Sequence, residues 1–347
     1  MKPKRAIILT VVLLLGVATL AGVLQLHQQM LAAGPATTTQ DLRIAPGSSL
    51  RAALRGLQDH GLIRHPRLLE VWLRCCNEPT RQQLPDIHAG HYRIEAGQPA
   101  LAVLNQLFTG RVILEQLTFV EGWNLQQVRK ALAQHPAIEH RSKDVPATEL
   151  LQHLGYAAGS AEGRFAPDTY RFEENSTDTQ ILRMAYEAQQ KRLKRAWEGR
   201  AANLPLATAD EALTLASIVE KETGLASERA QIAGVFINRL RKGMRLQSDP
   251  TVIYGLFDRY DGDIRKRDLI ADTPWNTYTR TGLPPTPIAM PGEAAIQATL
   301  APAVTDALYF VAQGDGSGAH QFSAGIEQHN QAVARYLQRL RQSKQAK

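Results

Sequence analysis

The sequence predicts an α+β protein with one N-terminal membrane-spanning helix, then a small mixed module, then a larger and mainly helical α+β domain. Three observations support this prediction. Residues 6–26 contain no charged side chain. Short strand patterns then alternate with short amphipathic helix patterns as far as about residue 118. From there to about residue 245, apolar residues recur mostly at helical spacing. The composition agrees, since 44% of the 347 residues are apolar and 21% are charged, which is typical of globular proteins.

The N-terminal segment has the pattern of a retained membrane anchor. Residues 1–5, MKPKR, carry three positive charges and no acid. The stretch 6–26 would rise about 31 Å as a helix, which matches the hydrocarbon core of a membrane. The positive flank predicts a single pass through the inner membrane, with the N-terminus in the cytoplasm and the rest of the chain outside. A cleaved signal peptide is the alternative, but the apolar stretch is longer than a signal core and no clean cleavage site follows.

A small module follows the anchor. Residues 27–43 are polar and small and include glycine and proline, which predicts a linker that tethers the folded domain to the membrane. The module is expected over 44–118, where glycine, proline and serine separate short apolar patterns of strand and helix period. Its expected elements are a short strand at 44, helices over about 49–59, 67–76 and 101–109, and strands over 90–94 and 112–120.

Cysteine content and net charge exclude several functions. Cys75 and Cys76 are the only cysteines and are adjacent. Adjacent cysteines bridge only through a strained ring, and no histidine cluster lies nearby, so we expect neither a disulfide framework nor a metal or other cofactor. Both are expected to be small buried residues. The net charge of +7 is too low for a nucleic-acid-binding face. Basic clusters at 191–195 and 239–245 indicate solvated helix faces or, more weakly, contact with an anionic wall polymer.

The larger domain is expected over 119–347. Asn124 can cap a helix with a regular apolar stripe, and a loop at 162–172 interrupts the helical region. Residues 273–293 hold five prolines and two glycines. A structured loop of this length inside a compact domain usually lines a functional groove. The domain ends with a strand over 307–312 and a terminal helix over 326–343.

The stretch LASIVEKETG at 215–224 places two glutamates, Glu220 and Glu222, at the end of an apolar run. Thr208 to Glu211 fits a capping box, so we expect the helix to begin at 208. At 100° per residue, Glu220 falls inside the apolar sector of the helix, and Glu222 falls about 160° away, also among apolar residues. The polar residues on the remaining side are Thr214, Ser217 and Lys221.

This helical geometry predicts at most one catalytic glutamate. A carboxyl among apolar groups has a raised pKa, as a general acid near neutral pH requires. The two carboxylates of a glycosidase flank the substrate about 5 to 9.5 Å apart, and side chains that diverge this far around a helix do not. On periodicity alone a structural role is favoured over catalysis: Glu220 would cap the helix or pair with an arginine such as Arg239.

Several short strings then follow one another along the chain. They are TFVEGWNL at 118–125, GRFAPDTY at 163–170, LASIVEKET at 215–223, VFINRL at 235–240, RLQSDPTVIYG at 245–255, NTY at 276–278, GLPPTPI at 282–288, LYFVA at 308–312 and GAHQFS at 318–323. With the anchor, they resemble the MltG (YceG-like) family of endolytic lytic transglycosylases over about 40–340. One departure is Ala166, where the family more often has a larger residue, which bears on the shape of the groove.

The resemblance implies a membrane-anchored lyase that cuts between N-acetylmuramic acid and N-acetylglucosamine within nascent peptidoglycan strands. It implies that the cut consumes no water, leaves 1,6-anhydro-muramyl ends and terminates strand elongation. The catalytic residue implied is Glu220. The module over 44–118 would be LysM-like and 119–347 would be the catalytic domain. The resemblance also suggests peptidoglycan synthases as partners.

The implied chemistry needs one carboxyl. Protonated Glu220 would donate to the glycosidic oxygen, and its carboxylate would then take the proton of the C6 hydroxyl that attacks C1. This nucleophile belongs to the same sugar, so its effective concentration is very high. Glu222 would then support the site or the fold. The candidates for hydrogen bonds to the sugars, or for stacking on them, are Asn238, Gln247, Tyr254, Asn276 and Tyr278.

Alternatives remain at the level of residues and of function. Asn238 could bond the backbone, Tyr254 could belong to the core, Asp249 suits a turn, and lone histidines such as His320 are usually structural. Two other functions stay open: a muramidase that uses the same glutamate with water, and a wall-binding scaffold without catalysis. A scaffold gives no reason for an acid on an apolar helix face, which favours the enzyme.

Overall fold

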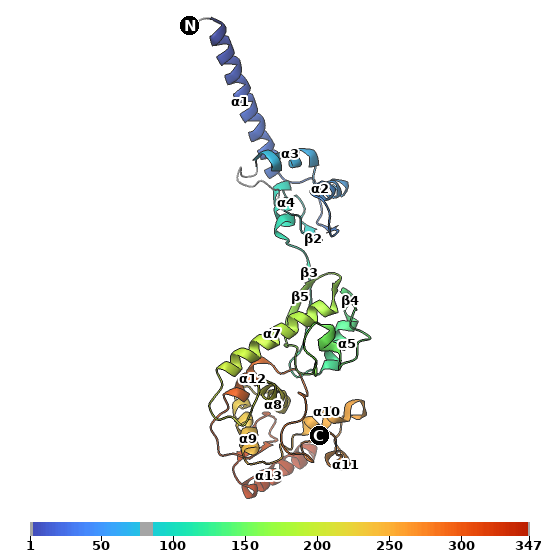
Figure 1. Cartoon of the computed structure of the whole chain (residues 1–347), viewed down its shortest axis with the longest axis vertical. Coiled ribbons are helices and arrows are strands. Elements are labelled where there is room, and N and C mark those ends of the chain that lie inside the picture. The colour runs from blue at the N-terminus through green and yellow to red at the C-terminus, as the bar shows by residue number, and fades with distance from the viewer. Residues whose placement is uncertain (1–2, 77–85, 346–347) are drawn as a thin grey trace. The chain divides into compact units, whose positions relative to one another are not determined.

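The structure is a computed structural model that describes residues 3–76 and 86–345 (Figure 1). The chain divides into two compact units. Unit 1 comprises Met1–Glu115 with Phe172–Glu174, and unit 2 comprises Gln116–Arg171 with Asn175–Lys347. Helices dominate, and each sheet among the described residues has two strands. The predicted α+β class with an N-terminal apolar helix is therefore confirmed.

Unit 1 begins with a long apolar helix, α1 (Pro3–Leu31). Its segment Thr10–Leu31 is long and apolar enough to cross a membrane. Large apolar side chains from Val11 to Leu24 stay exposed along it. Such a surface is unfavourable in water and is the one that a lipid environment requires. The apolar helix also continues beyond the predicted end of the span at residue 26.

The predicted linker over 27–43 contains regular structure at both ends, and part of it packs on unit 1. Helix α1 continues into this segment, and Met30 is only 3% exposed because it packs into the core of unit 1. After the helix, the Gly34 N–H donates to the Gly97 carbonyl at 3.0 Å, and the Gly97 N–H donates to the Ala36 carbonyl at 2.8 Å. The segment has a linker-like composition because few of its residues are apolar, but Met30 and Ala36 both fill the core.

A two-stranded sheet and three helices form the rest of unit 1. Strand β1 (Gln40–Ile44) pairs antiparallel with β2 (Gly90–Ile94) along their full length. Buried residues alternate near the end of each strand, and the Ser49 side chain caps the first of the three helices. These helices are α2 (Leu50–Asp59), α3 (Pro66–Cys76) and α4 (Ala100–Thr109). The side chains of Cys75 and Cys76, predicted to be buried, lie outside the described residues.

The remaining elements follow as small sheets and many helices. Strand β3 pairs with β5, β4 pairs parallel with β6, and β7 pairs antiparallel with β8. The strands are β3 (Leu114–Thr118), β4 (Ile138–Glu139), β5 (Thr169–Glu173), β6 (Ser176–Thr177), β7 (Tyr309–Ala312) and β8 (His320–Ser323). The helices are α5 (Leu125–Gln134), α6 (Leu150–His153), α7 (Asp178–Glu198), α8 (Ala209–Glu222), α9 (Arg229–Arg241), α10 (Asp249–Leu256), the 3-10 helix η1 (Phe257–Arg259), α11 (Lys266–Ile270), α12 (Glu293–Leu300) and α13 (Ile326–Gln345).

Helix α8 is central to the core of unit 2. Helices α7, α9, α10 and α12 pack on it, and α12 also packs on α7 and α9 (Figure 1). Every residue over 212–219 is buried, and no charged side chain occurs between Glu211 and Glu220. A close-packed helix has little freedom to shift. It therefore holds its last turn, with Glu220 and Glu222, in a fixed place at the edge of the core.

Candidate active site

The capping box predicted at the start of α8 is confirmed in part. The Thr208 hydroxyl accepts from the Glu211 N–H at 3.1 Å, as expected. The Glu211 carboxylate, however, accepts from the Ala207 N–H at 2.6 Å, so the reciprocal half of the capping box is shifted by one residue. The side of the helix that carries Thr214 and Ser217 is also buried. There the Ser217 hydroxyl donates to the Thr214 carbonyl and accepts from the backbone of the proline-rich segment.

Glu220 stands at the end of this covered helix and is half-buried. Its Oε2 accepts a hydrogen bond from the Gly292 N–H at 2.9 Å. Gly292 is the N-cap residue of α12, where the helix dipole stabilises negative charge. Burial raises the pKa of Glu220, the Gly292 N–H opposes this rise, and the nearby Glu121 carboxylate adds to it. Positive charge on Arg229 and Lys221 lowers the pKa by smaller amounts.

The segment that follows β3 lies against the same end of α8. The Gly122 N–H donates to the Met290 carbonyl at 2.9 Å, and the Met290 N–H donates to the Trp123 carbonyl at 2.6 Å. The Lys221 ammonium donates to the Gly122 carbonyl at 3.3 Å. Gly122 has a φ of 76°, and a β-carbon there would lie 3.9 Å from Cγ of Glu220. Two strings that are distant in sequence therefore meet around Glu220.

A cavity of about 470 Å³ adjoins this end of α8. Lys221, next to Glu220 in the chain, is one of its lining residues. Aromatic rings line another side, where Tyr254 and Phe257 lie 5.4 Å apart between centroids. Asn124 and two glutamines, Gln126 and Gln127, supply amide groups at the start of α5. Apolar rings together with a few polar groups are typical of small-molecule sites.

Glu222 faces a different environment, as the helical geometry predicts. Its carboxylate accepts a hydrogen bond from the Ser248 hydroxyl. Burial raises the pKa of Glu222 to about 7, and the Ser248 hydrogen bond limits this rise. The alternative that Glu220 pairs with Arg239 is wrong, because the Arg239 guanidinium donates to backbone carbonyls of Leu246 at 2.8 Å and of Leu308 at 2.6 Å.

Two of the five predicted sugar-binding residues use their side-chain amides for hydrogen bonds to backbone carbonyls. Asn238 Nδ2 donates to the Thr305 carbonyl at 2.7 Å and to the Ala307 carbonyl at 3.2 Å. Asn276 is 1% exposed, and its Nδ2 donates to the Ala271 carbonyl at 2.7 Å. Asn238 therefore bonds the backbone, as the alternative interpretation predicted. Neither Asn238 nor Asn276 lines the cavity.

The other three candidates differ from one another. Gln247 is exposed, and its Oε1 accepts from Arg239 at 3.3 Å. The Tyr278 hydroxyl donates a hydrogen bond to the Asp249 carboxylate, and burial raises the pKa of Tyr278. Tyr254 alone among the five predicted sugar-binding residues lines the cavity beside Lys221. The structure thus brings Tyr254 to the cavity that Lys221 also lines, and the other four do not line it.

Glu162 is a buried carboxyl that the sequence analysis missed. It is 5% exposed, and it accepts from the Leu125 N–H and from the Tyr254 hydroxyl, both at 3.1 Å. Burial raises its pKa to about 7, and these hydrogen bonds oppose the rise. The one sequence feature that could have indicated Glu162 is its position directly before the GRFAPDTY string. Within that string Ala166 is fully buried, and its N–H donates to the Ala185 carbonyl at 2.9 Å.

These features define the class of protein. Over the part of the chain that the structure describes, no group of three or more histidine, cysteine or acidic residues is placed to hold a metal ion. A half-buried carboxyl on a fixed helix, next to a polar and aromatic cavity, is the arrangement of an acid–base enzyme. Comparison with known proteins identifies the family. The chain belongs to the YceG-like family, whose family model matches residues 42–335.

Individual relatives agree with the family. The chain is 29% identical over 323 residues to the endolytic murein transglycosylase of Bacillus subtilis strain 168, covering 86% of this chain and 85% of the relative. It is 27% identical over 327 residues to the endolytic murein transglycosylase of Streptococcus pneumoniae strain D39, and spans 58% of that longer protein. The crystal structure of a YceG-like protein from Listeria monocytogenes superposes with a TM-score of 0.54 at 27% identity, covering 85% of this chain and 99% of the other.

Proposed function

We propose that this chain is an endolytic peptidoglycan lytic transglycosylase. It is a lyase that cuts between N-acetylmuramic acid and N-acetylglucosamine within nascent strands and leaves 1,6-anhydro-muramyl ends, which terminates elongation. The murein transglycosylase names of relatives aligned over most of the chain support the reaction class. The observation that carries the site is the half-buried Glu220 carboxyl, held by the Gly292 N–H beside the cavity.

In the first step Glu220 acts as a general acid. Its raised pKa keeps a larger share of the carboxyl protonated near neutral pH. The proton passes to the glycosidic oxygen as the bond from that oxygen to C1 of the muramyl sugar breaks. The N-acetylglucosamine side leaves with a free hydroxyl group. Positive charge grows at C1 as in other glycosidic cleavages, and the new Glu220 carboxylate stands near it.

In the second step the same carboxylate acts as a base. It takes the proton of the C6 hydroxyl while the C6 oxygen attacks C1 and closes the 1,6-anhydro ring. Glu220 ends protonated, as it began, so no water is consumed and no second carboxyl is needed. The nucleophile is held within the reacting sugar, which supplies the high effective concentration that replaces an activated water.

Neighbouring groups stabilise the intermediate state of Glu220. The Gly292 N–H holds Oε2 and leaves Oε1 for the substrate. Lys221 and Arg229 favour the carboxylate that exists between the two steps, and Glu121 favours the protonated acid. These influences act in opposite directions on the pKa of Glu220, a group that must donate a proton and then accept one. Glu222 holds the adjoining α10 through Ser248.

The chain is proposed to sit in the inner membrane as a single-pass protein. The basic residues of 1–5 would stay in the cytoplasm, and the folded units would lie outside. Residues 44–118 would form a LysM-like, wall-binding module, and 119–347 the catalytic domain. Support for the module comes from its own hydrophobic core. Peptidoglycan synthases are the proposed partners, because an enzyme that ends growing strands must meet them during synthesis.

Replacement of Glu220 tests the reaction. Glu220→Gln on purified glycan strands is expected to lower release of anhydro-muropeptides by about a hundredfold to ten-thousandfold, the usual contribution of general acid–base catalysis. The exposed Glu198→Gln on α7 is the control and should keep full activity. Mass spectrometry reads the products. Products heavier by one water would identify a muramidase. Full activity in a folded Glu220→Gln protein would remove Glu220 from catalysis, and a wild type that releases no product would leave only the wall-binding scaffold.

A further inference from the structure

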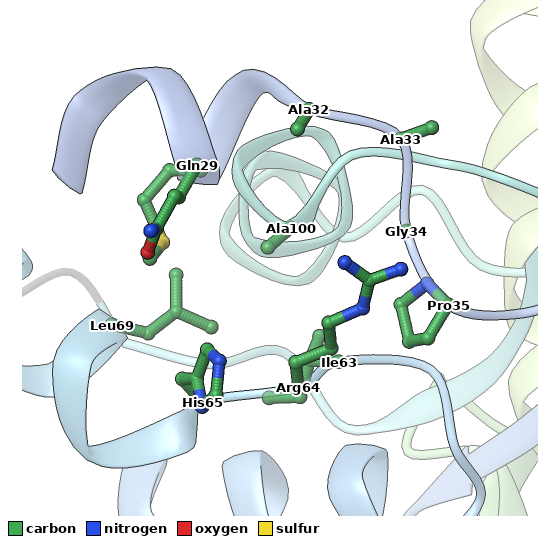
Figure 2. A pocket seen from close by; sticks show the side chains of 11 residues that line it. Gln29, Ala32, Ala33, Gly34, Pro35, Ile63, Arg64, His65, Leu69 and Ala100 are labelled. Atoms are coloured by element: carbon green, nitrogen blue, oxygen red, sulfur yellow. The ribbon is translucent and has the colours of Figure 1, made fainter. Parts of the chain in front are cut away.

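A second cavity lies in unit 1, at the end of α1 (Figure 2). The last turn of α1 and residues 32–35 form one side of it, and Ile63, Arg64, His65 and Leu69 form the other. Its volume is about 170 Å³, and no acidic residue lines it. The proposed reaction gives this cavity no role.

The cavity is held at the level of the lipid headgroups if α1 spans a membrane. Thr10–Leu31 rises about 33 Å as a helix, and a hydrocarbon core is about 30 Å thick. The last turn of α1 therefore lies at the boundary of the hydrocarbon, and residues 32–35 lie in the headgroup region. Met30 is packed in the core of unit 1, and the Gly34 N–H is bonded to Gly97. These contacts prevent the cavity from swinging away from the end of the helix.

The polar lining of the cavity suits an anion. Arg64 is exposed and, among the described residues, its guanidinium has no hydrogen-bond or ion-pair partner. Figure 2 shows this guanidinium extended toward the segment of residues 32–35. Arg64 and His65 directly precede α3, whose N-terminal dipole also favours negative charge. Leu69 and Ala100 give the cavity an apolar side as well.

Helix α3 presents an apolar surface beside the same helix end. Leu68 is 41% exposed and Val71 is 51% exposed, although both are large apolar residues. Helix α3 contacts α1, and the Trp72 ring stacks on His27 of α1 with centroids 5.9 Å apart. Tryptophan and exposed aliphatic residues next to arginines are typical of helices at the membrane surface.

We propose that unit 1 rests on the leaflet from which α1 emerges and that this cavity binds the phosphate of an anionic phospholipid. Arg64 pairs with the phosphate, while Leu68 and Val71 enter the glycerol and upper acyl region. The inference rests on the membrane anchoring proposed above. It adds a lipid-specific site that holds the module against the membrane surface.

Native mass spectrometry of the full-length protein tests the site. Wild type, Arg64→Gln and Arg43→Gln are released from nanodiscs that contain equal amounts of phosphatidylglycerol and phosphatidylcholine. Arg43 is the matched control, since it is an exposed arginine on β1 of the same unit. Wild type and Arg43→Gln should retain phosphatidylglycerol about fivefold over phosphatidylcholine, the effect of one arginine at an anionic surface. Arg64→Gln should lose this preference.

Two results would overturn the inference: an unchanged preference in Arg64→Gln, or an equal loss in Arg43→Gln, which would indicate general charge attraction. Hydrogen exchange of α3 gives an independent reading, because the helix should be more protected in phosphatidylglycerol nanodiscs than in pure phosphatidylcholine. Equal protection would count against it. Flotation with phosphatidylcholine vesicles separates the two proposals. A wild type that fails to float refutes the anchor. A wild type that floats but shows no preference for phosphatidylglycerol in the mass spectra refutes only the headgroup site.

Discussion

Glu162, Glu220 and Glu222 are three carboxyls that unit 2 removes from water, and their partners differ. Glu162 joins the start of α5 to Tyr254, and Glu222 accepts from Ser248. Each of these two is bonded to another element of the framework. Among the described residues, Glu220 has one hydrogen-bond donor, the Gly292 N–H. One free oxygen on a half-buried carboxyl fits a group that exchanges protons with a substrate better than it fits a structural tie.

The stability of the protein is expected to fall as the pH rises from about 5 to about 8. Burial raises the pKa of Glu222 from its ordinary 4.5 to about 7. The unfolded chain therefore loses this proton at a lower pH than the folded chain does. The stabilising contribution is complete below about pH 4.5 and disappears as the pH rises through about 7. For this group the free energy of unfolding falls by up to about 3 kcal/mol.

Thermal unfolding of the full-length protein in detergent, at about pH 5 and about pH 8, measures this effect. Glu222→Gln keeps an acceptor for Ser248 and should remove part of the pH dependence. The remainder belongs to Glu162, whose pKa is also raised to about 7, and to Glu220, whose pKa burial raises as well. The exposed Glu198→Gln should behave as wild type. An identical pH dependence in wild type and Glu222→Gln would contradict the assignment.

Tyr254 is expected to act on substrate binding through its ring. Its ring packs near Phe257 and Trp275, with both centroid distances 5.4 Å, and it lines the cavity. Tyr254→Ala should raise KM for glycan strands about tenfold, because an aromatic contact is worth about 1 kcal/mol or more. Tyr254→Phe keeps the ring and should restore most of the affinity. Steady-state kinetics of both variants decide the matter, and an equal KM for wild type and Tyr254→Ala would remove Tyr254 from the site.

At the scale of elements, the site is a junction of three segments. The last turn of α8 supplies Glu220, the N-terminus of α12 supplies the Gly292 N–H, and the segment after β3 supplies Glu121 and Gly122. Two backbone hydrogen bonds, from the Gly122 N–H to the Met290 carbonyl and from the Met290 N–H to the Trp123 carbonyl, hold the second and third segments together. Since no one segment contains the whole site, its electrostatics depend on how closely these three pack.

Gly292→Ala tests that packing. A β-carbon at this position would collide with the Glu121 carboxylate, which is exposed and can swing away. The stability should therefore change by less than about 1 kcal/mol. Loss of the negative neighbour lowers the pKa of Glu220, so the alkaline fall of kcat/KM should move to lower pH.

The pH–rate profiles of Gly292→Ala and Gly325→Ala make the comparison. A β-carbon at Gly325 has no atom within 4 Å, so this control should keep the wild-type profile. Glu121→Gln should shift the alkaline limb in the same direction as Gly292→Ala. A shift to higher pH in either variant would show that the Glu121 charge does not act on Glu220 as described.

At the scale of the whole molecule, the apolar helix α1 and the rest of unit 1 are packed together. The core of unit 1 includes Met30 from the end of α1, and backbone bonds tie Gly34 and Ala36 to Gly97. A module fixed in this way cannot diffuse on a long tether. In the proposed anchored state, its distance from the membrane is set by the packing of residues 30–36 rather than by chain entropy.

Gly34→Ala should loosen this connection. Its β-carbon would collide with the backbone carbonyl of Gln98, which cannot rotate away as a side chain can. We expect a loss of about 1–3 kcal/mol, as for other overpacked sites, and faster proteolysis within 27–43. Gly56→Ala on α2 meets no atom within 4 Å and should stabilise its helix by about 0.5–1 kcal/mol. Limited proteolysis in detergent compares them, and equal cleavage rates would contradict the tight junction.

Features set by neighbours in the chain were predictable. The Thr208 and Asn124 caps are confirmed in position, because a cap acts over three residues. The divergence of Glu220 and Glu222 is confirmed too, since the helical period alone fixes it. The packing of 27–43 on unit 1 was not predictable, for the opposite reason. The composition of this segment is polar overall, and the three apolar side chains that enter the core, Met30, Ala36 and Leu42, find their partners far away in the sequence.

The sequence by itself determined the apolar N-terminal helix, the α+β class, the central helix and the acid at its end, because these depend on short-range patterns and on strings shared with a family. Only the tertiary structure decided which groups surround that acid. The Gly292 N–H lies 72 residues from Glu220, and Tyr254 lies 92 residues from Glu162. Contacts over such separations follow from packing of whole elements, and no local pattern encodes them.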